Sequence, residues 1–158
     1  MDPVHRLVRI NATEVNAFAL LADDFNPIHM DDVAARAAGF AGRICHGALL
    51  TSVISGMIAN AFPGAVWMEH NVQFKRPALV RQTFEFVLSL DETIKKPTKS
   101  LGVVTVTVHD TAGNLLATSR NVVLLPAPLE INAKTASATQ TASAEESSLM
   151  EAGVGKAR

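Results

Sequence analysis

The chain has 158 residues, of which 48% are hydrophobic, and a formal net charge of −1. This length suits one domain with its own core and is too short for a second full domain. Because the chain has no surplus of basic residues, it is a poor partner for nucleic acid. Its single cysteine excludes an internal disulfide framework and favours a reducing cytoplasm. No apolar run is long enough to span a membrane.

The first predicted helix begins at a capping box, Asn11-Ala12-Thr13-Glu14, and its apolar spacing continues to about Ala22. Pro27 has no N–H group and favours an extended conformation at Asn26, so the helix is not expected to continue. Residues 24–29 are therefore predicted to form a loop that leaves the helix.

Two more helices are expected, a short one at 32–38 and a longer, mostly apolar one at 47–62. The texture then changes to that of strands, because β-branched residues alternate with polar ones. The predicted strands cover residues 66–74, 83–91, 101–109 and 115–125. Helices followed by an antiparallel meander predict an α+β fold, with the sheet curled around the long apolar helix.

The folded domain is expected to cover residues 4–128. From residue 129 to 158 the sequence is rich in Ala, Ser, Thr and Glu and contains no aromatic residue. Such a segment buries too little apolar surface to offset the entropy of ordering, so it is predicted to be a disordered, low-complexity tail.

The chemistry is expected in the segment Asp24-Phe25-Asn26-Pro27-Ile28-His29. A carboxylate and an imidazole five residues apart on a stiff loop can converge on one water, and both can exchange protons near neutral pH. Asn26 can hold the loop by bonding to backbone and is grouped with the substrate site. Taken alone, the same segment also fits an ordinary turn with a surface histidine.

A second element is His46-Gly47, at the start of the long predicted helix. There the first N–H groups have no intrahelical acceptor, and the helix dipole is positive. Because Gly47 has no side chain, a thioester carbonyl can approach its N–H closely, and a developing enolate would be stabilised there. Tight packing is the competing interpretation of Gly47, and His46 is expected to be structural, bonding to backbone at the helix cap.

Other chemically suggestive residues carry less weight. Glu69 and His70 are neighbours on a strand and face opposite sides, so they are interpreted as structural. Lys75 and Arg76 could meet the phosphates of a coenzyme A or phosphopantetheine arm and are grouped with the substrate site, although a solvated surface is the default interpretation. Cys45 is expected to be a buried, inert thiol. No cluster has the spacing of a zinc site, so no metal is predicted.

These segments resemble the MaoC-like dehydratases. The resemblance covers about residues 10 to 126, and its closest subgroup is the short, single-domain (R)-specific enoyl-CoA hydratases of polyhydroxyalkanoate metabolism. It is carried by Ala22-Asp23-Asp24-Phe25-Asn26-Pro27-Ile28-His29, by Ile44-Cys45-His46-Gly47-Ala48-Leu49-Leu50, and by Val72-Gln73-Phe74-Lys75-Arg76-Pro77.

The resemblance implies a homodimer of hot-dog domains, each an antiparallel sheet wrapped around a long helix. It implies reversible syn hydration of trans-2-enoyl-CoA to (R)-3-hydroxyacyl-CoA by a hydro-lyase without a cofactor, coenzyme A being part of the substrate. Asp24 and His29 would activate the water and Gly47 would bind the thioester carbonyl. Ser55 and Ile58 would line the acyl pocket.

Two departures from the family pattern stand out. Asp23 replaces a common glycine and is expected to face solvent, and Val80-Arg81-Gln82 replaces a Val-Gly-Asp turn. Three alternatives stay open: a 3-hydroxyacyl-ACP dehydratase, a hot-dog acyl-CoA thioesterase, and a non-enzymatic acyl-thioester-binding partner subunit.

Overall fold

The computed structural model describes residues 1–95 and 100–126 of the chain. The elements follow one another as β1 (Val4–Ile10), α1 (Ala12–Ala22), α2 (Pro27–Met30), α3 (Asp32–Ala37), α4 (Gly47–Ala61), β2 (Val66–Phe74), β3 (Gln82–Lys95), β4 (Ser100–Asp110) and β5 (Leu115–Leu125). The tail predicted at 129–158 lies outside the described residues.

The strands form one antiparallel, five-stranded sheet in the order β1-β3-β4-β5-β2. The predicted meander is correct for β3, β4 and β5 and wrong for β2, which pairs with β5 instead of β3. The chain therefore crosses from one side of the sheet to the other between β2 and β3. Which strands pair depends on the packing of the whole sheet. The alternation of residues within one strand predicts which face is buried and does not identify the neighbouring strand.

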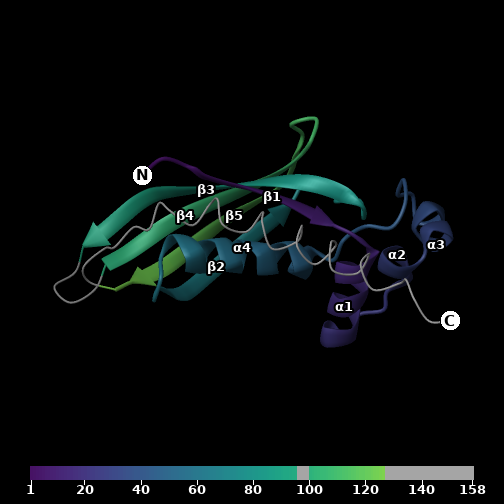
Figure 1. Ribbon diagram of the computed structural model, residues 1–158, viewed down its shortest axis with the longest axis horizontal. Helices are drawn as coiled ribbons and strands as arrows, with labels where there is room; N and C mark the ends of the chain where they lie inside the picture. Colours follow the sequence, from purple (N-terminus) through teal and green to yellow (C-terminus); the bar gives the residue numbers. More distant parts are fainter. Residues whose placement is uncertain (96–99, 127–158) are drawn as a thin grey trace, which may run out of the picture.

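Helix α4 runs lengthwise along one face of the curved sheet, while α1, α2 and α3 gather beyond one end of it (Figure 1). Its inward residues and those of the sheet form one hydrophobic core. This core includes Leu50, Ile54, Met57, Ile58, Phe84, Phe86, Leu88, Val104, Val106, Val108 and Val123. The predicted α+β arrangement, a sheet around a long apolar helix, is confirmed.

Two elements were not predicted. Strand β1 pairs with β3, yet Leu7 on it is 66% exposed, so its apolar residues do not alternate cleanly. Helix α2 is a single turn within the segment predicted to be a loop, and Pro27 begins it. Proline fits the first helical position because the N–H it lacks would have no intrahelical partner there.

Candidate active site

Asp24 is placed by the end of α1. Asp23 closes this helix in the left-handed region, with φ 52°, and is exposed as predicted. The chain then turns, and the Asp24 carboxylate accepts the N–H of Asn26 at 3.2 Å. Asn26 in turn caps α2, since its side-chain oxygen accepts the N–H of Ile28 at 3.4 Å. Its predicted backbone-bonding role is confirmed, and it holds the segment between Asp24 and His29.

His29 is buried, with 8% of its surface exposed. Its Nδ1 lies 2.9 Å from the Ile44 carbonyl oxygen; a carbonyl can only accept, so Nδ1 carries the proton and Nε2 is an acceptor. Burial lowers the pKa of His29 below its ordinary value, with a smaller lowering by His46, against opposing effects of the Ile44 bond and the Asp24 charge. The imidazole is therefore neutral at pH 7, and its Nε2 can accept a hydrogen bond.

Arg43 was not recognised from the sequence. Its Nε donates to the His29 carbonyl at 2.6 Å and its Nη2 donates to the Asn16 side chain at 2.8 Å. These bonds tie α1 to α2 and hold the backbone of His29. Arg43 lies in an irregular segment without periodicity, so no sequence signal marks this contact.

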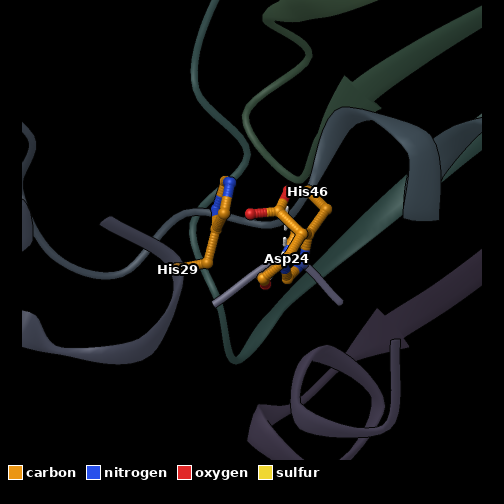
Figure 2. Close-up of side chains that lie close together, drawn as sticks. All are labelled: Asp24, His29 and His46. Carbon is orange, nitrogen blue, oxygen red and sulfur yellow. Dashed lines mark hydrogen bonds and ion pairs between the residues drawn. The ribbon is translucent and has the colours of Figure 1, made fainter. Parts of the chain in front are cut away.

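His46 lies beside the predicted pair. One side-chain atom each of Asp24, His29 and His46 falls within 4.8 Å of the others, and Figure 2 shows the Asp24 carboxylate directed toward the His29 ring. A bond from the His46 side chain to the helix cap was predicted, and the structure does not show one. Instead, His46 Nε2 lies 3.0 Å from the Asp24 carbonyl oxygen. The prediction of a backbone bond was right, but its place was wrong.

The two imidazoles lie against each other beside Asp24. The rings of His29 and His46 are tilted relative to one another, with centroids 3.9 Å apart and planes inclined by 33°. Proton exchange with a water is the chemistry that this group of side chains supports.

A cavity of about 400 Å³ adjoins the cluster. It brings together four predicted residues: His29 and Gly47 in its wall, and the exposed Lys75 and Arg76. Gly47 begins α4, so its N–H has no intrahelical acceptor. Phe74 packs against it so closely that a β-carbon at Gly47 would lie 2.6 Å from Phe74 Cζ.

The predicted acyl-pocket residues do not line this cavity. Ser55 is exposed and Ile58 is buried in the core, whereas Leu50, one turn after Gly47, contributes to the wall. Its position three residues after Gly47 places it on the same helix face, which is the signal that could have identified it. Phe40, Ile44, Phe74 and Ala78 also line the cavity and were not predicted.

Glu69, His70 and Cys45 were predicted to have no catalytic role, and their contacts in the structure agree with this. His70 Nδ1 bonds to the Asn121 side chain at 2.8 Å, and Glu69 lies 3.8 Å from Arg120. Cys45 is 5% exposed, and burial raises the pKa of its thiol to about 12. A thiol of this kind is a poor nucleophile, in agreement with the prediction.

Known proteins resemble this chain in sequence and in structure. The model of the family described as MaoC like domain matches residues 2–113. An (R)-specific enoyl-CoA hydratase of Aeromonas caviae is 34% identical over 120 residues, which are 75% of this chain and 88% of that protein. A mitochondrial 3-hydroxyacyl-[acyl-carrier-protein] dehydratase of Arabidopsis thaliana is 37% identical over 78 residues, covering 49% of this chain and 47% of the relative.

Among solved structures, an (R)-hydratase from A. caviae described as involved in PHA biosynthesis superposes with a TM-score of 0.73. It is 29% identical, and the match covers 79% of this chain and 95% of that one. The likeness therefore extends over nearly the whole of that protein, and the family match at residues 2–113 includes the segments that carry the site.

Proposed function

The chain belongs to the family of MaoC-like domains, and we propose that it is an (R)-specific enoyl-CoA hydratase of the hot-dog fold. As a hydro-lyase, it adds water reversibly to a trans-2-enoyl-CoA and forms (R)-3-hydroxyacyl-CoA. The observation that carries this proposal is that Asp24 lies beside His29, and that His29 and the free helix start at Gly47 line one cavity. The reaction requires no cofactor beyond the coenzyme A of the substrate itself.

Water activation is assigned to Asp24 and His29. A water between them donates one hydrogen bond to the carboxylate and one to His29 Nε2, which the Nδ1 bond to Ile44 leaves without a proton. A lone pair of this water is then free to attack C3. Asp24 is the base toward the water and His29 positions it, and the proton that leaves returns to C2 on the same face.

The thioester carbonyl is assigned to the N–H of Gly47. Attack at C3 moves charge onto the carbonyl oxygen, and a fixed N–H at the positive end of a helix stabilises this enolate without reorganisation. The exposed side chains of Lys75 and Arg76 border the same cavity, where they can meet the phosphates of coenzyme A.

The acyl chain is assigned to the apolar side of the cavity, at Leu50. Ser55 and Ile58 lie further along α4 and do not border the cavity of a single chain. Their predicted contact with the acyl group would require a longer pocket, and it stays a prediction.

We further propose that two copies join edge to edge through β2. This strand ends the sheet and exposes large apolar side chains, with Val66 53%, Met68 60% and Phe74 50% accessible. An unpaired edge of this kind is covered in stable proteins, and a second β2 would cover it. Light scattering on the purified protein tests this directly, and a monomer at micromolar concentration would contradict it.

A cytoplasmic location stays a prediction of the sequence. Among the described residues, no helix combines the length and apolarity that crossing a membrane requires.

A dehydratase acting on acyl carrier protein thioesters is the second candidate. The 37% identity to the Arabidopsis dehydratase favours it over the thioesterase and over a non-enzymatic partner subunit. The two reactions share the same chemistry in opposite directions, and they differ in the carrier of the acyl group.

Hydration of crotonyl-CoA, followed by the loss of enoyl absorbance, tests the proposal. Asp24→Asn and His29→Ala are each expected to lower kcat by at least ~100-fold, because acid-base groups contribute about that much. Asp23→Asn is the matched control: it removes the neighbouring, exposed carboxylate and should keep near wild-type activity.

Three other outcomes of these assays would contradict the proposed function or favour another enzyme class. A product of S configuration would contradict the proposed stereochemistry. Release of free coenzyme A without loss of the double bond would indicate a thioesterase. Turnover of crotonyl-ACP with none of crotonyl-CoA would favour the dehydratase.

A further inference from the structure

His46 contacts Asp24 and His29 and is joined to Gly47, without lining the cavity. The residue is buried, with 2% of its surface exposed. Its ring packs against the His29 ring at a tilt of 33°, with centroids 3.9 Å apart, and lies 5.1 Å from the Phe18 ring. Its Nε2 faces the Asp24 carbonyl oxygen at 3.0 Å, and its backbone precedes Gly47.

The hydrogen bonds define the role that this ring can play. Since the Asp24 carbonyl only accepts, His46 Nε2 carries the proton and donates it. Its Nδ1 is buried and has no hydrogen-bond partner among the described residues. The ring therefore has no open path for exchanging a proton with a substrate, and its contacts are with the groups that would do so.

We propose that His46 is a positioning residue, which holds Asp24 through the Nε2–H bond to its carbonyl and thereby keeps the carboxylate aligned with His29 and Gly47. The proposal deepens the proposed function and rests on it. The Asp24 side chain needs such a restraint because it is 48% exposed and lies in the four-residue connection between α1 and α2. The packing against His29 and the peptide link to Gly47 fix the other two groups relative to the same ring.

Two substitutions of His46 distinguish the contribution of its hydrogen bond from that of the packing of its ring. His46→Gln places an amide N–H close to the position of Nε2 and loses the ring. His46→Phe keeps a ring of similar size for the packing and loses the donor. With the bond lost, the loop can displace the carboxylate, and a displacement of about 1 Å costs up to ~100-fold in rate.

Kinetics on an enoyl-CoA substrate gives the first test. His46→Phe is expected to lower kcat about 10- to 100-fold with KM changed less than about twofold, since the cavity wall is untouched, and His46→Gln is expected to recover most of the loss. Thermal unfolding shows that both variants are folded. Wild-type kcat in the Phe variant, or equal losses in two folded variants, would overturn the proposal.

Nitrogen-15 NMR of the wild-type histidine rings gives a test that needs no activity. His46, assigned by its absence from the Phe variant, is expected in the Nε2–H form, and His29 in the Nδ1–H form. Finding His46 with its proton on Nδ1 would overturn the proposed bond even in an active enzyme. Finding the expected forms in a protein that hydrates no thioester would uphold the bond and reject the proposed function.

Discussion

Substituting Gly47 by alanine distinguishes an oxyanion site from mere tight packing. The new methyl group would lie 2.6 Å from Phe74 Cζ and 2.9 Å from Cε2, so the ring has to move by roughly 0.8 Å to restore an ordinary contact of about 3.4 Å. Phe74 is half-exposed and can rotate outward. Overpacking costs about 1 kcal/mol in such a case, and the helix preference of alanine over glycine returns about the same amount.

The expected result is an unchanged stability with a lost activity. The methyl group stands beside the N–H that the thioester carbonyl approaches, so kcat/KM should fall about 100-fold, as when an oxyanion donor is removed. Gly56→Ala is the matched control on the same helix, because its β-carbon would meet Arg6 Nη1 at 3.6 Å, an ordinary contact. Both variants are measured by hydration of crotonyl-CoA and by urea unfolding.

A third variant separates the two explanations for a loss. In Gly47→Ala/Phe74→Leu the clash is relieved, while the methyl group stays at the cavity wall. If this double variant recovers wild-type kcat/KM, or if Gly47→Ala never loses it, the glycine serves packing alone, and the argument that the thioester carbonyl needs a residue without a side chain here is refuted.

Four further predictions follow from backbone strain at Arg81 and from the burial of His29 and Cys45. Arg81 has φ 71°, so Arg81→Gly should raise the free energy of unfolding by about 0.5 to 1 kcal/mol while Arg81→Ala does not; equal effects in urea unfolding would contradict the backbone explanation. Burial lowers the pKa of His29 below 6.5, so kcat/KM should hold as the pH falls to 6.5 and decline only below it. The unfolded chain takes up this proton first, so as the pH falls below 6.5 wild type should lose unfolding free energy that His29→Gln keeps; a parallel pH dependence in both would be the contrary result. Cys45, with a thiol pKa of about 12, should resist iodoacetamide at pH 8 until urea unfolds the protein, and rapid labelling of the folded chain would show an open site.

Long helices and strands with a clear hydrophobic period were predictable from the sequence. A one-turn helix, and a strand whose apolar residues do not alternate, were not. The apolar helix α4 and strand β5 were predicted within a residue or two, because each buries a face whose spacing is visible in the sequence. Strand β2 was also predicted with its observed bounds, although none of its residues is fully buried. The single turn of α2 is too short to show a period. Strand β1 was missed because Arg6 and Leu7 interrupt its alternation while their backbone pairs with β3.

The candidate site divides in the same way. Asp24, His29 and Gly47 could be proposed because each stands beside a local feature, a proline turn or a helix start, that explains its residue type. The contacts of His46 with Asp24 and of Arg43 with His29 join residues 22 and 14 positions apart. Such contacts depend on how the helices pack against one another, so no local sequence pattern predicts them.

The two departures from the family pattern acquire a common explanation. Asp23 and Arg81 are the residues other than glycine that adopt positive φ in the described part of the chain, and they stand where the resemblance leads one to expect glycine. Both residues thus adopt a backbone conformation that favours glycine. At Asp23 the left-handed conformation ends α1 and turns the chain so that Asp24 reaches His29 and His46. Since aspartate tolerates this region better than most residues, the substitution keeps the turn that the active site requires, at a modest cost in stability.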